Sequence, residues 1–189
     1  NVVVGSNKIK GVIGAKAIHL QDPKEREIPL KSKNLYIDIG AKDKEDAETK
    51  VKIGDYAVFD TEFSSVDNII IGKALDDRIG CYIISEILKK TYNVPITGVF
   101  TVQEEIGLRG SAVAAYTVNP DFAIVVEGTF ASDVPDTKEE EYCTTLGKGP
   151  AITFMDRTYI AEKKLINWII RIAENHNIPY QYKRTTFGG

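Results

Sequence analysis

Two adjacent glutamates, Glu104 and Glu105, follow an apolar β-type run at Val99–Val102, and glycines at positions 107 and 110 come soon after them. Neighbouring side chains of a regular strand point to opposite faces, so both glutamates can serve one site only where the strand has ended and the chain turns. Strand ends of this kind carry the sites of α/β sheets. The pattern predicts that both glutamates face a metal centre, whereas the plainer alternative is a solvated loop pair.

Two further acids occupy comparable positions. Asp76 lies where a loop enters an amphipathic helix expected over Ala74–Lys90, and Glu127 ends the apolar run Phe122–Val126. Because the carboxyl ends of parallel strands open on one side of a sheet, these acids and Glu105 are expected to converge there. Buried carboxylates pack together only when a cation compensates them or a proton is shared.

A pair of divalent metal ions would supply that compensation. Asp76 would bridge the two ions with one oxygen for each, and Glu105 and Glu127 would hold one ion apiece. Glu104, offset by one residue, would stay off the metals and take a proton from bound water, whose pKa the metal lowers. Each part alone is a weak signal, whereas the ordered set DDRxG, QEExG and an acid-ended apolar strand is fairly specific.

The length, composition and net charge of the chain limit the classes of protein to which it can belong. The 189 residues suffice for one domain or two small ones, and 43% hydrophobic with 27% charged residues is ordinary for a soluble globular protein. A net charge of −3 gives no basic face for nucleic acid, and no apolar run approaches the ~20 residues of a membrane span. Without a signal-peptide pattern and with only Cys81 and Cys143, both expected to be buried, a reducing cytoplasm is predicted.

The chain changes character after Gly72. Residues 1–72 are predicted to be β-rich, with strands at 2–4, 10–13, 35–39, 56–59 and 68–71 and a short helix capped by Asp43. Residues 73–189 alternate between helices and strands, which predicts an α/β layer with a mostly parallel sheet. The expected elements there are helices at 74–90, 111–116 and 161–176 and strands at 97–103, 122–126, 151–154 and 178–182.

Neither histidine is predicted to bind a metal. His19 has no carboxylate neighbour and no second ligand at helical or strand spacing, so a structural or loop role is expected. His176 lies at the end of the last predicted helix, where it can donate to free carbonyls.

Six segments resemble the M42 metallo-aminopeptidases, the TET or glutamyl-aminopeptidase-like enzymes, some of which are labelled endoglucanase or cellulase. They are GVIGAKAIHLQ (11–21), LYIDIGAKDKEDA (35–47), GKALDDRIG (72–80), TVQEEIGLRGS (101–111), ASDVP (131–135) and LGKGPAI (146–152). The resemblance implies a peptidase domain of α/β/α sandwich type, here partial, with an inserted PDZ-like or β-barrel dimerisation domain. It also implies peptide substrates, two zinc or cobalt ions, and dimers that assemble into hollow tetrahedral particles.

The resemblance assigns the same roles to the acids. Asp76 matches the bridging ligand, Glu104 the general base, Glu105 a terminal ligand, and Glu127 the acidic ligand of the other ion, where many relatives carry Asp. Relatives hold the peptide bond after the bridging aspartate cis. The family also uses one ligating histidine upstream of the insert and another near the C-terminus, and neither has a counterpart here. We therefore expect a fragment that lacks both ends, stops before a GGTDA-like segment after Phe187, and binds metal poorly by itself.

Three alternatives stay open at this stage. A glycoside hydrolase also uses two carboxylates, but those must flank a sugar bond, which adjacent glutamates match poorly. A non-catalytic assembly subunit with a degenerate peptidase fold would fit the abrupt ends, although the intact QEE segment argues against it. The third alternative makes the acids a solvated rim. Side-chain specificity depends on pocket residues that the sequence does not identify.

Overall fold

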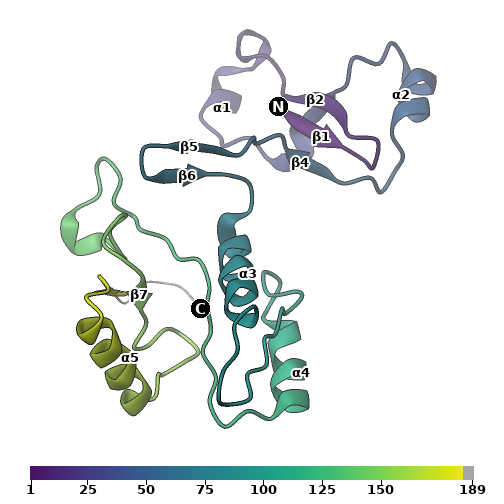
Figure 1. Cartoon of the computed structure of the whole chain (residues 1–189). Coiled ribbons are helices and arrows are strands. Elements are labelled where there is room, and N and C mark those ends of the chain that lie inside the picture. Colours follow the sequence, from purple (N-terminus) through teal and green to yellow (C-terminus); the bar gives the residue numbers. More distant parts are fainter. Residues whose placement is uncertain (185–189) are drawn as a thin grey trace. The chain divides into compact units, whose positions relative to one another are not determined.

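The computed structural model describes residues 1–184, and the expectations placed on Phe187–Gly189 lie outside that range. The chain divides into two compact units, residues 1–73 and residues from 74 onward (Figure 1). The first unit is built mainly of short strands, and the second carries the longer helices. The mixed α/β class expected from the sequence is therefore confirmed.

Unit 1 is organised on an antiparallel sheet with the spatial order β3-β2-β1-β4. Its strands are β1 (Val2–Val4), β2 (Ile9–Gly14), β3 (Tyr36–Asp38) and β4 (Ala57–Phe59). Val2 and Val4 of the central strand are buried, whereas Val3 between them is only partly covered, as the two-residue period of a strand requires. These four strands lie where the alternating apolar runs predicted them.

The rest of unit 1 consists of a hairpin and short helices: β5 (Ser64–Val66), β6 (Ile69–Ile71), α1 (Pro23–Arg26), α2 (Lys44–Lys50), and the 3-10 turns η1 (Ile18–Leu20) and η2 (Ser32–Asn34). The predicted cap of α2 is confirmed, since the Asp43 side chain accepts the backbone N–H of Asp46 at 2.8 Å. Strand β5 was not predicted, because two of its three residues are serines. It pairs with β6 across a two-residue turn in which Asp67 has a positive φ.

Between residues 74 and 184, unit 2 contains three helices and one parallel strand pair. They are α3 (Leu75–Leu88), α4 (Arg109–Val118), α5 (Lys163–Asn175), β7 (Ala151–Ile152) and β8 (Gln181–Tyr182), with the 3-10 turn η3 (Glu139–Glu141). All three helices occur where apolar periodicity placed them. Helix α5 buries Ile166 and Ala173, and His176 ends it as expected, with its backbone N–H donating to the carbonyl of Ile172.

Two expected strands, 97–103 and 122–126, are not formed as strands in the part of the chain that the structure describes. Both sequences are apolar enough for a buried strand, but no ladder partner for either lies within residues 1–184. As a consequence Phe122 is 80% and Val125 82% exposed, although they occupy opposite positions of the two-residue period. The expectation was wrong because periodicity reports the tendency to be buried, while a strand also needs a hydrogen-bonded neighbour.

The two cysteines differ in burial. Cys143 is buried with 1% exposure, whereas Cys81 is exposed on α3, so burial of both cysteines was wrong. Cys81 lies on a side of α3 that solvent reaches, and apolar periodicity alone did not separate this position from the buried positions of the helix. Within residues 1–184 no helix is both long and apolar enough to span a bilayer.

Candidate active site

Asp76 and Asp77 form the first turn of α3, and neither has helical backbone angles. The peptide bond between them is cis, as the family resemblance implied. The carboxylate of Asp77 accepts the backbone N–H of Gly80 at 3.0 Å, so Asp77 caps the regular part of the helix. Asp76 lies one residue before that cap, in the segment where the chain enters the helix.

The carboxylate of Asp76 lies against the residue that follows Glu127. A Cβ placed on Gly128 would come within 2.9 Å of Oδ1 of Asp76, so the carboxylate lies close against the backbone of this glycine. The same end of α3 also approaches the backbone, because a Cβ on Gly80 would lie 2.6 Å from the carbonyl oxygen of Val126. Helix α3 therefore holds Asp76 beside Glu127.

Glu104 and Glu105 lie in the turn that leads to α4. Gln103 has a left-handed backbone with φ of 59°, and the carbonyl of Glu104 accepts the backbone N–H groups of Gly107 and Leu108. The chain therefore turns at the two glutamates, as their adjacency required. Both side chains are exposed.

Charge interactions join three of the four predicted acids. Burial raises the pKa of Glu127, Lys183 opposes that rise, and the nearby charges of Glu104 and Asp76 add to it. Residue Glu127 is nevertheless classed as exposed, so the protein covers only part of its side chain. The structure thus brings Asp76, Glu104 and Glu127 within electrostatic reach of one another, whereas Glu105 is not among the charges that act on Glu127.

Two further charged residues, which the sequence reasoning missed, face the same group. Asp156 follows β7 and Lys183 follows β8, and both act on Glu127. Backbone N–H groups of Thr158 and Tyr159 donate to the carboxylate of Asp156 at 2.7 and 2.8 Å, and the first of these is the main reason that its pKa is lowered. Each residue follows a strand of only two residues, so the apolar pattern before it gave little local signal.

The donor set was compared with the needs of a divalent ion. Carboxylate oxygens suit divalent metals, and Asp76 and Glu127 supply them side by side. Within residues 1–184, however, no three side chains of His, Cys, Asp or Glu converge closely enough to hold an ion. Both histidines lie away from the acids along the chain, since His19 belongs to η1 of unit 1 and His176 ends α5. The donor chemistry fits, and the coordination sphere is incomplete.

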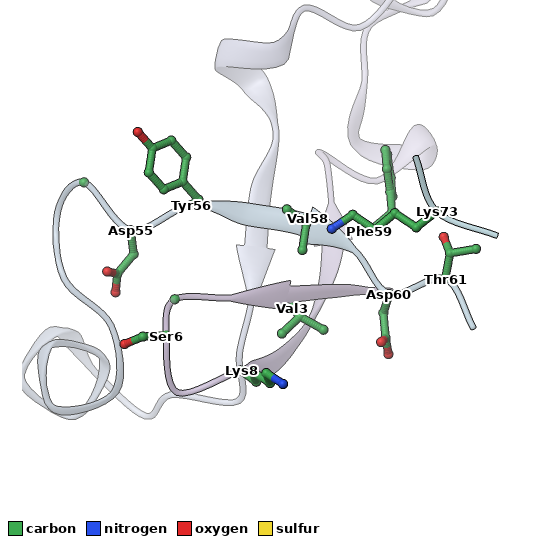
Figure 2. Close-up of a pocket in the computed structure, with 12 residues that line it drawn as sticks. Val3, Ser6, Lys8, Asp55, Tyr56, Val58, Phe59, Asp60, Thr61 and Lys73 are labelled. Carbon is green, nitrogen blue, oxygen red and sulfur yellow. The ribbon is translucent and has the colours of Figure 1, made fainter. Parts of the chain in front are cut away.

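A shallow cavity of ≈ 680 Å³ lies in unit 1, on the sheet rather than among the acids of unit 2. Figure 2 shows that Val3 and Val58, from the paired strands β1 and β4, line it together with charged residues such as Asp55, Asp60 and Lys8. Asp55 is occupied by accepting the backbone N–H of Lys52, and Asp60 by an ion pair with Lys10. Among the described residues, the lining of this cavity holds no group of catalytic or metal-binding side chains that point toward one another.

Comparisons with known proteins bear on this arrangement. The family model described as M42 glutamyl aminopeptidase matches residues 1–189. FrvX of Escherichia coli (strain K12) is 36% identical over 185 residues, which cover 96% of this chain and 52% of FrvX. The lysyl aminopeptidase of Pyrococcus furiosus is 31% identical over 176 residues, covering 90% of this chain and 49% of that enzyme.

A solved structure gives the same assignment for the fold. The TET aminopeptidase of the marine sediment archaeon Thaumarchaeota archaeon SCGC AB-539-E09 superposes with a TM-score of 0.90 at 37% identity, covering 100% of this chain and 55% of that chain. The chain therefore belongs to the M42 peptidase family. It spans about half the length of the curated relatives that it matches.

Proposed function

We propose that the protein is a metal-dependent aminopeptidase, which removes N-terminal residues from peptides. The observation that carries the proposal is the contact of the Asp76 carboxylate with Gly128, next to Glu127, in a chain that matches the M42 family along its whole length. Asp76 thus approaches the segment of Glu127, which is far from it in the sequence, and metal-assisted hydrolysis uses acids brought together in this way.

Asp76, Glu105 and Glu127 are the proposed ligands of two divalent ions, zinc or cobalt. Such ions, when bound, supply a water of lowered pKa and polarise the scissile carbonyl. Asp76 is the proposed bridging ligand, and the hydrogen bond from the Gly80 N–H to Asp77 holds the turn that contains it. The three carboxylates do not fill the coordination spheres of two ions, so the two histidine ligands that the family resemblance implies remain to be supplied.

Glu104 is the proposed general base. It lies one residue before the ligand Glu105, at the start of a turn fixed by two backbone hydrogen bonds to its carbonyl. A carboxylate held off the metals but within electrostatic reach of Glu127 can take a proton from the attacking water and pass it to the leaving amine. The proposal therefore gives adjacent residues different roles, with Glu104 as the base and Glu105 as the ligand.

We also propose that the protein forms homo-oligomers through unit 1. Structural neighbours include PhTET1-12s, described as a dodecamer in the asymmetric unit, and a TET1 peptidase of Pyrococcus horikoshii, described as able to assemble into a tetrahedron or a large octahedral shell. These cover all of the present chain at 34% and 36% identity. Unit 1 is the proposed dimerisation insert, and a dimer-based assembly is the expected state.

The test compares isosteric variants of the adjacent glutamates in the full gene product. Hydrolysis of aminoacyl-p-nitroanilides should be abolished by EDTA and restored by zinc or cobalt. Glu104→Gln should lower kcat by about 10²–10⁴-fold without weakening metal binding, because only proton transfer is lost. Glu105→Gln should weaken metal binding measured by calorimetry.

Three results would contradict the proposal. Equal effects of the two substitutions on metal affinity would remove the distinction between base and ligand. Hydrolysis of cellulose without hydrolysis of any aminoacyl-p-nitroanilide would favour the glycosidase alternative. One structural neighbour, from Thermotoga maritima, is described as an endoglucanase. A full gene product that hydrolyses no aminoacyl-p-nitroanilide, with or without added zinc or cobalt, would favour a non-catalytic assembly subunit.

A further inference from the structure

The side-chain amide of Gln181, in β8, binds the backbone of one loop at three points. Its Oε1 accepts the N–H of Thr145 at 2.7 Å, and its Nε2 donates to the carbonyls of Thr145 and Gly149 at 3.0 and 2.8 Å. A glutamine amide offers one carbonyl oxygen and two N–H donors, so the oxygen and both donors are paired here. We call these three hydrogen bonds the Gln181 clamp.

The clamp attaches segment 143–149, which contains this loop, to β8. On one side β8 pairs with β7, whereas segment 143–149 forms no strand. A backbone hydrogen bond also joins the segment to the chain that follows β8, from the N–H of Arg184 to the carbonyl of Cys143 at 2.9 Å. A strand in this position would be held by the regular hydrogen bonds of a ladder. Here the side chain of Gln181 supplies bonds of that kind.

Segment 143–149 is in turn bonded to a second part of the chain. The N–H groups of Cys143 and Thr144 both donate to the carbonyl of Ala131, at 2.9 and 3.2 Å. Cys143 is 1% exposed and Thr144 8%, so these bonds lie in one of the most covered parts of unit 2. The hydroxyl of Thr144 also donates to the carbonyl of Phe130 at 3.1 Å. The segment therefore joins β8 to residues 130 and 131.

Ala131 lies three residues after Gly128, whose backbone lies close to the carboxylate of Asp76. We propose that Gln181 is a positioning residue, which acts through segment 143–149 to hold the chain that contacts Asp76 in place. The inference rests on the proposed function, because it takes the approach of Asp76 to Gly128 to be part of the active site.

Loss of the clamp should release segment 143–149 as a local unit. Without the amide of Gln181, one N–H and two carbonyls lose their partners where the protein partly covers them, and they regain hydrogen bonds only when the segment opens to water. Local opening of this kind leaves the rest of a domain folded. Cys143 reports the opening because its thiol is buried in the closed segment, and the exposed thiol of Cys81 is an internal reference.

The test measures alkylation by iodoacetamide and amide hydrogen exchange in the full gene product, both read by peptide mass spectrometry. Gln181→Met keeps the length of the side chain and removes the amide. It should speed alkylation of Cys143 about 10–100-fold, the order expected when three partly buried hydrogen bonds are lost. Amides of segment 143–149 should lose protection from exchange, whereas those of α5 should keep it.

Two further variants complete the set. Gln181→Glu keeps an acceptor for the N–H of Thr145 but has no N–H to donate, so it should open the segment as well and replaces Gln181→Met if methionine disturbs the fold. Gln21→Met is the matched control, because it removes a glutamine amide that donates to a backbone carbonyl of unit 1 and should leave Cys143 protected.

A positioning role also predicts a loss of activity. In both Gln181 variants kcat for an aminoacyl-p-nitroanilide should fall about 10–100-fold, the order that a small misplacement of active-site groups costs. The inference is overturned if neither variant speeds alkylation of Cys143, if α5 loses protection to the same extent, or if the segment opens and kcat is unchanged. Failure of the proposed function is distinct, because it is judged on chelator-sensitive hydrolysis by the parent protein and on Glu104→Gln.

Discussion

The proposed role of Glu127 and its surroundings favour opposite protonation states of its carboxyl group. As a proposed ligand it must be ionised, yet burial beside other acids raises its pKa in the folded protein. The native state therefore binds a proton at this residue more tightly than the unfolded chain does. Stability contributed by the protonated form is present at low pH and is lost as the pH rises through the raised pKa, so the ionised side chain is destabilising at neutral pH.

Glu127→Gln should therefore stabilise the metal-free protein at pH 7. The expected gain is a rise in Tm of roughly 1–2 °C, because solvent screening limits the electrostatic effect at a side chain that still reaches water. The gain should shrink as the pH falls towards the range in which glutamate is protonated. Thermal unfolding in EDTA at several pH values measures it, with Glu140→Gln, at an exposed position of the 3-10 turn η3, as a control. A pH-independent gain would show that the charge is not its cause.

Residues at this scale were only partly predictable. Asp76, Glu105 and Glu127 were grouped because each lies at a recognisable break in an apolar pattern, and Glu104 was added as the neighbour of Glu105. Of these residues, Asp76 and Glu104 act on the pKa of Glu127 in the structure, and Glu105 does not. Asp156 and Lys183 follow strands of only two residues each, which give a weak local signal. Their proximity to Glu127 depends on how distant segments pack, which sequence spacing does not report.

At the scale of elements, the approach of α3 to the segment 126–128 holds the site together. Gly80 is the point of contact, since a Cβ there would lie within 2.6 Å of the Val126 carbonyl oxygen and of both carboxylate oxygens of Asp77. The Val126 atom belongs to the backbone and cannot rotate away. Helix α3 therefore has to shift if Gly80 gains a side chain, and Asp76 shifts with it.

Gly80→Ala tests this contact. In an ordinary helix the change would stabilise by about 0.5–1 kcal/mol, because glycine loses more backbone entropy than alanine. Here we expect a loss of about 1–3 kcal/mol, the usual cost of forcing an extra carbon into a packed position. Urea unfolding measures the change in free energy of unfolding, and Arg78→Ala, on the same helix, is the control. Stabilisation by Gly80→Ala would show that α3 does not pack closely on this segment.

Elements differ in how far the sequence predicted them. Helices α3, α4 and α5 were predicted because apolar periodicity, caps and breakers are local properties of the chain. Segments 97–103 and 122–126 were predicted as strands on equally strong apolar patterns and did not form ladders within the described residues. A ladder needs a partner from elsewhere in the polypeptide, and the strength of an apolar run does not supply one.

At the scale of the whole molecule, the exposed apolar residues of segment 122–126 are a liability. Phe122, Ile124 and Val125 are 80%, 62% and 82% exposed, so both sides of one extended segment face water. Apolar segments with unpaired backbone are templates for association with other chains. The 189-residue chain studied alone should therefore self-associate in a concentration-dependent way.

Replacing two of these side chains should reduce that association. The double variant Phe122→Ser with Val125→Lys removes apolar area and adds a charge on opposite sides of the segment, so it should shift the sedimentation profile of the chain towards monomer and lower its binding of an apolar dye. The far-UV circular dichroism spectrum should stay unchanged, because neither residue lies in a helix or a paired strand. Ile53→Lys is the matched control, since Ile53 is fully exposed in unit 1. Equal loss of self-association in the control would assign the effect to general hydrophobicity instead of segment 122–126.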